Sequence, residues 1–351
     1  MHKIRLHRLV PLALAVIATL LAFAASQATA STIVRIETNL GNIDIRLFDT
    51  ATPVSVANFL NYVTDGDYDG SFFHRAPLTF RSNSQGDLVD EFGAPLPLDA
   101  DGNPILTNAV VDTFVVQGGG FTFTDADGVG SVPTDAPILN EPGLTNLPGT
   151  IAYARSSAVN SATSGFFFNT SNNVADLDNQ NEGFAVFARV VRGQSVLDAI
   201  TALPVPDLDG VPGMTFNDVP FLTPANDDPD SLADNLIFIN NTSILDVPTG
   251  DYNFDGVVNA SDFSVFTSEF GNSLRIVDRQ NSNPGTEVDS DGNGDGAINA
   301  ADFVLLRDTI GAASSATSPI VLSAAIPEPT AATTLAIGVL LSACPMRRRC
   351  C

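Results

Sequence analysis

Apolar and polar residues alternate on both sides of a short turn in the segment Val34-Arg-Ile-Glu-Thr-Asn-Leu-Gly-Asn-Ile-Asp-Ile-Arg-Leu47. Successive side chains of a strand point to opposite faces, so this alternation predicts a β-hairpin with one buried face. Thr52 and Pro53 then provide a helix N-cap and a first-turn proline. The apolar residues that follow at helical spacing are Val56, Phe59, Leu60 and Val63.

Short apolar runs bounded by turn residues continue to about residue 247. They predict strands at 71–74, 113–117, 150–154, 165–169, 185–191 and 235–240, and a short helix at 195–200. Many short strands with only two helices favour a mainly β fold, a small closed barrel, over an alternating α/β sheet.

The charge of the chain is strongly acidic. Its 351 residues carry 40 acidic and 16 basic side chains, and residues 31–330 hold all 40 acids but only 10 of the bases. A body this acidic is repelled by phosphate backbones, so nucleic acid is excluded as a partner.

Residues 31–330 also contain no Lys, no Cys and, apart from His74, no His. The residues needed for a lysine Schiff base, a thiol nucleophile or a multi-histidine metal site are therefore absent from this part of the sequence. Any catalysis by residues 31–330 must therefore use carboxylates, arginine, amides or the shape of a binding site.

Residues 1–30 have the three parts of a secretory signal peptide. A basic start with Lys3, Arg5 and Arg8 precedes an apolar run over 9–25 and a small-residue exit ending at Ala30. Cleavage would leave a mature chain beginning at Ser31, outside the cytoplasm. A retained membrane anchor is the alternative interpretation.

The last residues, 326–351, resemble a PEP-CTERM sorting signal. Pro327-Glu-Pro-Thr330 precedes an apolar run over 331–343 and then Arg347-Arg-Arg349, and residues 312–325 form a linker before them. The run is shorter than the roughly 20 residues that span a bilayer. The resemblance implies processing by an exosortase-type enzyme and a protein exported to the cell envelope, the surface or the extracellular space.

A twelve-residue pattern occurs twice within residues 249–311, called here the calcium-loop module. Oxygen donors stand at positions 1, 3, 5, 9 and 12, a glycine at 6 and a backbone carbonyl at 7, as an EF-hand loop requires. The predicted calcium ligands are Asp251, Asn253, Asp255, Val257, Asn259 and Asp262 in the first loop, and Asp291, Asn293, Asp295, Ala297, Asn299 and Asp302 in the second.

Each loop runs into a predicted amphipathic helix, ended by Gly271 and Gly311 respectively. Asp rather than Glu at position 12, and no obvious helix before each loop, resemble a dockerin, a duplicated calcium module. The resemblance implies a small α-helical domain and a cohesin-like partner.

Ordered motifs over residues 32–203 resemble a cyclophilin-type peptidyl-prolyl cis-trans isomerase of the bacterial branch. The motifs are Thr38-Asn-Leu-Gly-Asn42, Val56-Ala-Asn-Phe59, Tyr68-Asp-Gly70, Phe72-Phe-His-Arg75, Phe114-Val-Val-Gln-Gly-Gly119, Ser161-Ala-Thr163, Phe166-Phe167 and Val186-Phe187. The resemblance implies a closed eight-stranded barrel with two helices over residues 31–247, carrying an insert at about 77–112.

The same resemblance implies the site and its substrate, proline-containing polypeptides. Arg75, with Phe114 and Gln117, would be catalytic, and no metal would be needed for isomerisation. The substrate-binding residues would be Val115, Ala154, Arg155, Phe167, Leu177 and Phe184, with Ala154 and Arg155 acting through the main chain. His74 is expected to be structural.

Some positions depart from the family pattern. Gly165 replaces the usual glutamine, and Asp176 replaces an aromatic residue that grips cyclic peptides such as cyclosporin. These departures keep an alternative open: a surface adhesion or scaffold protein whose barrel binds proline-containing segments with little turnover. None of the predicted catalytic residues lies within 249–311, so the sequence predicts isomerisation independent of calcium.

Overall fold

The computed structural model describes residues 30–80, 94–99, 102, 111–124, 126–205, 216, 218–222, 232–276 and 288–314. Of the predicted signal peptide, residues 1–30, only Ala30 is described; the sorting tail and most of the insert lie outside the described residues. The described residues up to Ile310 belong to one compact unit.

The predicted hairpin is confirmed. Strands β1 (Ile33–Thr38) and β2 (Gly41–Leu47) pair antiparallel, with Val34 opposite Ile45 and Ile36 opposite Ile43. These four side chains are fully buried, as the alternation requires. The opposite face of β2 is buried too, because Asp44 and Arg46 are only 2% and 5% exposed, so the prediction of a single buried face is wrong for this strand.

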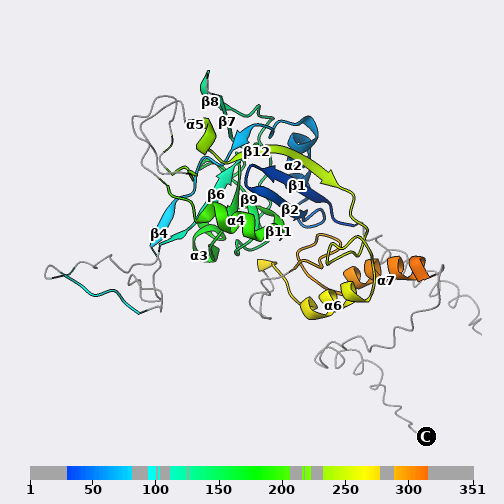
Figure 1. Ribbon diagram of the computed structural model, residues 1–351. Helices are drawn as coiled ribbons and strands as arrows, with labels where there is room; N and C mark the ends of the chain where they lie inside the picture. Colours follow the sequence, from blue (N-terminus) through cyan, green and yellow to red (C-terminus); the bar gives the residue numbers. More distant parts are fainter. Residues whose placement is uncertain are drawn as a thin grey trace, which may run out of the picture. The chain divides into compact units, whose positions relative to one another are not determined.

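A ten-stranded antiparallel sheet grows outward from this hairpin (Figure 1). The further strands are β3 (Ser71–Phe72), β6 (Val115–Gly118), β7 (Phe121–Thr124), β8 (Gly128–Ser131), β9 (Thr150–Tyr153), β10 (Phe166–Asn169), β11 (Val186–Arg192) and β12 (Phe238–Leu245). Their spatial order is β6-β10-β9-β11-β2-β1-β12-β3-β7-β8. The fold is mainly β, but these ladders leave β6 and β8 at the two ends, so a closed eight-stranded barrel is not confirmed.

A separate two-stranded ribbon stands where the insert leaves the sheet. Strands β4 (Leu78–Phe80) and β5 (Val111–Thr113) pair antiparallel, and Phe114 N donates to Pro77 O at 3.0 Å. The ribbon therefore brings the two ends of the insert together directly beside Phe114.

Both helices predicted before residue 247 are present, as α2 (Pro53–Asp65) and α4 (Gln194–Thr201). Thr52 is the N-cap residue of α2 but makes no side-chain capping bond. The carboxylate of Glu141 accepts instead from the backbone N–H groups of Val54 and Ser55, at 3.1 and 2.7 Å. A side chain distant in sequence therefore satisfies the open N–H groups at this helix end.

The remaining helices are α3 (Val174–Leu177), the 3₁₀ turn η3 (Gln180–Glu182), α5 (Leu232–Asn235), α6 (Ala260–Glu269) and α7 (Ala300–Ser314). Helices α6 and α7 follow the two predicted calcium loops. Gly271 lies just past α6 with φ +92°, a left-handed conformation that suits glycine. Gly311 does not end α7 as predicted: the helix continues to Ser314, because two good helix formers, Ala312 and Ala313, follow the glycine.

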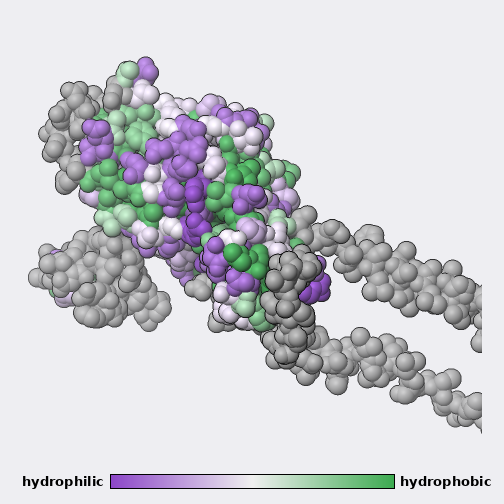
Figure 2. Space-filling view, turned by 45° about the vertical axis from the view of Figure 1, so that its right-hand side comes forward, coloured by the Kyte–Doolittle hydropathy of each residue, from purple (hydrophilic) through white to green (hydrophobic). Residues whose placement is uncertain are grey.

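Three clusters of buried apolar side chains hold these elements together. The largest fills the space between the sheet and helices α2 and α4, and a small one lies under β7 and α5. The remaining cluster joins residues near β6 and β10 to apolar residues of the calcium-loop module, including Leu274 and Leu306. Hydrophilic and hydrophobic patches intermix on the outer face drawn in Figure 2. Every helix of the described residues is too short or too polar to cross a membrane.

Candidate active site and calcium loops

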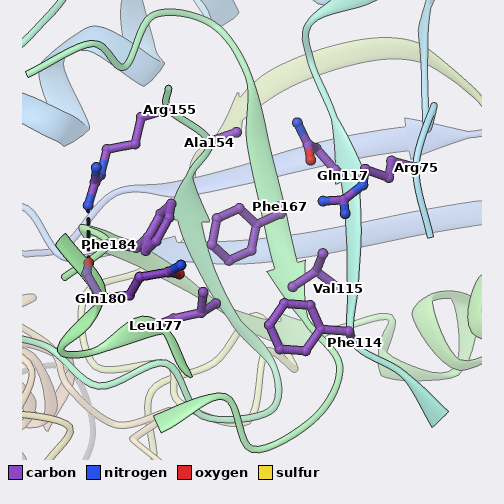
Figure 3. Close-up of a pocket in the computed structure, with 10 residues that line it drawn as sticks. All are labelled: Arg75, Phe114, Val115, Gln117, Ala154, Arg155, Phe167, Leu177, Gln180 and Phe184. Atoms are coloured by element: carbon purple, nitrogen blue, oxygen red, sulfur yellow. Dashed lines mark hydrogen bonds between the residues drawn. The ribbon is translucent and has the colours of Figure 1, made fainter. Parts of the chain in front are cut away.

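One cavity of about 220 Å³ brings together all nine residues predicted for the active site. It is lined by Arg75, Phe114, Val115, Gln117, Ala154, Arg155, Phe167, Leu177 and Phe184, and by one residue that was not predicted, Gln180. Figure 3 shows the apolar rings gathered at its centre, with Arg75 and Gln117 at one rim and Arg155 at the opposite one.

The apolar floor of the cavity comes from three elements. Val115 lies on β6, Phe167 on β10 and Leu177 at the end of α3, and each is at most 6% exposed. The ring of Phe184 stands edge-on to that of Phe167, with centroids 5.8 Å apart and planes at 71°. Phe114 borders the same space and is only partly buried. Such a floor suits a small apolar ring, such as that of proline.

Arg75 and Gln117 are held side by side through their backbones. Gln117 N donates to Arg75 O at 2.7 Å, and His74 N donates to Gln117 O at 3.0 Å. The Arg75 guanidinium is half exposed, and its ion pair with Asp218 is long, at 3.7 Å between Nε and Oδ2. A pair this exposed is weak, so the guanidinium can turn toward a ligand in the cavity.

Arg155 contributes its side chain rather than only its main chain. Its guanidinium lies 4.3 Å from the centroid of the Phe184 ring and donates to the carbonyls of Gln180, Asn181 and Gly183. Desolvation by burial lowers the pKa of Arg155. Through its hydrogen bonds to these carbonyls, Arg155 fixes the turn that carries Phe184 and Gln180. Nothing in the sequence marks Gln180, because only the folded turn brings it to the cavity.

A wider hollow of about 450 Å³ continues from this cavity and shares Gln117, Ala154 and Arg155 with it. Gly165 lies at its edge, where a side chain would reduce its volume. His74 also borders it but is only 3% exposed, and its ring packs against Phe121 at 4.7 Å between centroids. Desolvation lowers the pKa of His74 to about 4, so its imidazole is neutral near pH 7. This environment agrees with a structural role.

The two predicted calcium loops have the same internal hydrogen bonds. In the first loop, the carboxylate of Asp251 accepts from the N–H groups of Asp255 and Gly256, at 3.1 and 2.9 Å. In the second, Asp291 accepts from those of Asp295 and Gly296, at 3.1 and 2.7 Å. The position-12 carboxylates, Asp262 and Asp302, each accept from the N–H at position 9. The sequence repeat is therefore a structural repeat.

Carboxylates are buried together in both loops. Asp262, Asp291 and Asp302 have no exposed surface, and Asp251 has 2%. Desolvation, and then the nearby charges of Asp302 and Asp295, raise the pKa of Asp291 well above its usual range; desolvation raises that of Asp302 to about 6. A cation would relieve this desolvation and repulsion, and the Asp, Asn and carbonyl oxygens are donors that Ca²⁺ prefers.

Acidic side chains alone do not make a metal centre here. No group of three or more His, Cys, Asp or Glu in the described part of the chain is gathered as a metal site. The oxygens of Asn253, Asn259 and the position-7 carbonyl would have to complete the first ligand set, as in the predicted pattern.

Comparison with known proteins identifies the β part of the chain. Residues 33–214 match the family model described as cyclophilin type peptidyl-prolyl cis-trans isomerase/CLD. The chain belongs to the cyclophilin family. A peptidyl-prolyl cis-trans isomerase of Acinetobacter baylyi is 35% identical over 182 residues, which cover 51% of this chain and 77% of that protein. Peptidyl-prolyl cis-trans isomerase B of Escherichia coli is 35% identical over 175 residues, or 48% and 82% of the two chains.

This cyclophilin is therefore a peptidyl-prolyl cis-trans isomerase. Among solved structures, a Cryptosporidium parvum cyclophilin type isomerase covers 62% of this chain and 99% of its own, at 18% identity and a TM-score of 0.38. Residues 249–311 match a second family model, that of the dockerin type I domain. The chain thus combines an isomerase with a dockerin domain, the calcium-loop module.

Proposed function

We propose that this cyclophilin isomerises X-Pro bonds of secreted or surface proteins, with Arg75 as its catalytic group. The observation that carries the proposal is the single cavity that places a guanidinium beside an apolar floor of proline size. The neighbouring hollow that shares Gln117 and Ala154 gives room for the residues before the proline.

The reaction itself explains why such a site is sufficient. Amide resonance sets a barrier of roughly 18–20 kcal/mol for rotation about the peptide bond, and X-Pro isomerisation takes tens of seconds or more unaided. No proton transfer or covalent bond is required. A catalyst must hold the proline ring and favour the twisted bond, in which the prolyl nitrogen becomes pyramidal.

Each side chain then has a defined task. Val115, Phe167 and Leu177 hold the ring, and Phe114 closes the space over it. The Arg75 guanidinium donates to the carbonyl or the prolyl nitrogen as resonance weakens, which stabilises the twisted state more than either planar one. Arginine suits this task because it is always charged and presents a planar fork. Gln117 holds Arg75 or the peptide backbone.

The sheet also closes into a barrel under this proposal. An isolated antiparallel bridge joins Arg75, just after β3, to Gln117 on β6. The sheet order from β6 to β3, with both included, contains eight strands, so this bridge supports an eight-stranded ring. The catalytic pair Arg75 and Gln117 would then stand at the closing seam.

The calcium-loop module would bind two Ca²⁺ ions and attach the isomerase to a cohesin-like partner. The buried carboxylates of both loops support calcium, and the dockerin match supports the partner. Export through the N-terminal signal, sorting by an exosortase-type enzyme and location at the surface or outside the cell complete the proposal.

Exchange NMR on a short Ala-Pro peptide tests the central claim. The wild-type chain should exchange cis and trans forms far faster than the uncatalysed peptide, and a peptide without proline should not bind. Peptide binding without faster exchange would instead favour the alternative of a proline-binding scaffold.

A further inference from the structure

A connecting segment, residues 143–147, lies between the calcium-loop module and the isomerase pocket. On the module side, Ile276 N donates to Gly143 O and Thr145 N donates to Leu274 O, both at 2.8 Å. These two bonds form a short antiparallel ladder, with Leu144 opposite Arg275. Leu144 is 3% exposed.

The other side of the connecting segment holds the pocket wall. Asp178, directly after Leu177, accepts from Thr145 Oγ1 at 2.7 Å and from Asn146 N at 2.8 Å. Asn146 Nδ2 donates a hydrogen bond to the carbonyl oxygen of Phe184 at 3.5 Å. Thr145 and Asn146 have no exposed surface, and Asp178 is 5% exposed. Two pocket residues, Leu177 and Phe184, are thus attached to the segment that the module holds.

The module is docked on the body at other points as well. The carbonyl of Gly294, in the second calcium loop, accepts from Thr50 N and Ala51 N, at 3.1 and 3.0 Å. Arg189, on β11, pairs with Asp289 at 2.9 Å, and its side chain is only 11% exposed. The contacts are therefore polar as well as apolar.

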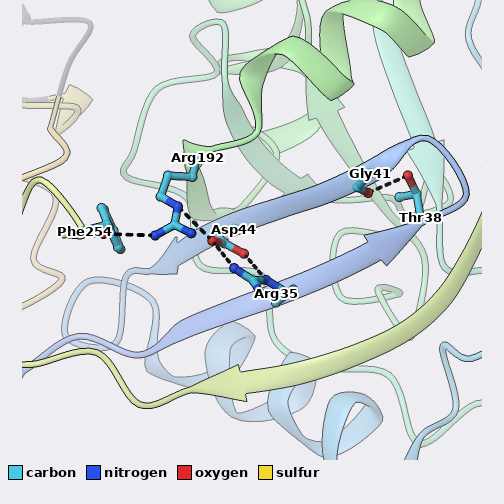
Figure 4. Close-up of polar contacts among 6 residues, drawn as sticks. All are labelled: Arg35, Thr38, Gly41, Asp44, Arg192 and Phe254. Carbon is cyan, nitrogen blue, oxygen red and sulfur yellow. Dashed lines mark hydrogen bonds and ion pairs between the residues drawn. The ribbon is translucent and has the colours of Figure 1, made fainter. Parts of the chain in front are cut away.

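The first loop is held by a charged group on the sheet (Figure 4). Arg192 donates to the Phe254 carbonyl at 3.3 Å, and its guanidinium lies 5.3 Å from the Phe254 ring centroid. Asp44, 2% exposed, pairs with Arg192 at 3.2 Å and orients it. Both loops of the repeat therefore contact the isomerase domain, the first at Arg192 on β11 and the second at the turn after β2.

From these contacts we infer that the calcium-loop module is a positioning element of the isomerase pocket. Through the connecting segment and Asp178, it fixes the wall that carries Leu177 and Phe184. The inference rests on the proposed proline pocket and calcium loops, and it replaces the sequence-based expectation that isomerisation is independent of calcium. Undocking should raise KM, because the wall holds the proline ring, and leave kcat little changed, because Arg75 stands on the far rim.

One glycine allows the docking to be disrupted selectively. A Cβ on Gly294 would lie 2.7 Å from Asp49 N and 2.9 Å from Leu47 O, both backbone atoms that cannot move aside. Position 4 of a loop tolerates a side chain, since Phe254 occupies it in the first loop at φ +59°. Gly294→Ala should therefore undock the second loop without removing a calcium ligand.

Gly271→Ala is the matched control. Gly271 also has a left-handed conformation, at φ +92°, but a Cβ there would meet nothing within 4 Å. Both variants carry the cost of placing alanine at positive φ, and only Gly294→Ala clashes with the sheet.

A second pair of variants tests the connection itself. Thr145→Val removes the hydroxyl donor to Asp178 and keeps the side-chain shape, while Thr145→Ser restores the donor. If Asp178 is a positioning residue, Thr145→Val should raise KM several-fold at constant kcat, and Thr145→Ser should return KM toward the wild-type value.

The measurements use the full chain, with calcium and with a chelator. In Gly294→Ala, we expect a several-fold higher KM for an Ala-Pro peptide and faster amide hydrogen exchange at Asn146, Leu177 and Phe184. Exchange in β12 and in helix α4, which make none of the contacts with Gly294, should not change, and this would show that the variant is folded. Chelation should have the same effects on the wild type and add little in Gly294→Ala.

Two outcomes separate the failure of this inference from that of the proposed function. A wild type that isomerises and binds calcium, beside a Gly294→Ala variant with unchanged KM and unchanged exchange, would overturn the positioning role. A wild type without turnover would refute the proposed catalysis, and the exchange of the Leu177 and Phe184 amides would still decide whether the module holds the wall.

Discussion

Replacement of Arg75 by alanine tests the catalytic role that we propose for its guanidinium. Its cost in stability is small, because the side chain is 48% exposed and its pair with Asp218 is 3.7 Å long and equally exposed. Exposed pairs of this kind contribute about 0–1 kcal/mol to stability. A fall in activity in Arg75→Ala would therefore not report unfolding.

The expected loss of activity follows from the same geometry. A preorganised donor aimed at charge that develops in the transition state contributes roughly 2.7–4 kcal/mol. The exposure of Arg75 favours the lower end, and about 2.7 kcal/mol corresponds to a hundredfold fall in kcat/KM. The loss should fall mainly on kcat, with peptide affinity little changed, because the contact strengthens only as the bond twists.

Exchange NMR on a short Ala-Pro peptide would measure the effect, with three companion variants. Arg75→Lys keeps the charge without the planar fork and should recover only part of the rate. Phe114→Ala should weaken peptide binding and lower kcat/KM in proportion, with kcat little changed, since the ring is held in both states. Arg307→Ala is the control: this arginine, on helix α7, has a side chain that is 52% exposed and pairs with Asp308. Its replacement should leave kcat/KM unchanged. Equal rates for wild type and Arg75→Ala would refute the catalytic role.

Four further predictions concern stability, calcium and inhibitors. The pKa of His74 falls from about 6.5 in the unfolded chain to about 4 in the folded one. Below pH 6.5 the unfolded chain therefore binds a proton that the folded chain does not, and the free energy of unfolding decreases by roughly 3 kcal/mol between pH 6.5 and pH 4. Urea unfolding of wild type and His74→Asn at pH 7 and 4.5 should show the difference narrowing in acid. Glu141→Ala should lower the free energy of unfolding by about 1–2 kcal/mol, because two N–H groups of α2 lose their acceptor, and Glu141→Gln should lose less. Calorimetry should find two Ca²⁺ per wild-type chain and one for Asp255→Ala, whereas a stoichiometry of two in the variant would refute the assigned ligand. Cyclosporin should bind weakly because Asp176 replaces the aromatic residue expected there, and nanomolar inhibition would show that assignment to be wrong.

Patterns with a short period in the sequence were sufficient to predict many of the secondary-structure elements and most of the candidate site residues of this protein. The alternation in residues 34–47 predicted the hairpin with its buried face, and helical spacing predicted α2 and α4. The repeated Asp and Asn spacing predicted two equal loops, and ordered motifs predicted nine of the ten residues that line one cavity. Such features are readable because strand alternation, helical periodicity and turn chemistry depend on neighbours a few residues away.

Partners distant in sequence were decided only by the tertiary structure. The cap of α2 comes from Glu141, 87 residues after Val54, and not from the adjacent Thr52. The side chain of Arg155 fixes the Phe184 turn, and residues 143–147 join the calcium-loop module to Asp178. No local pattern encodes these contacts, because the partner of a buried polar group is whichever group the fold brings within hydrogen-bonding distance.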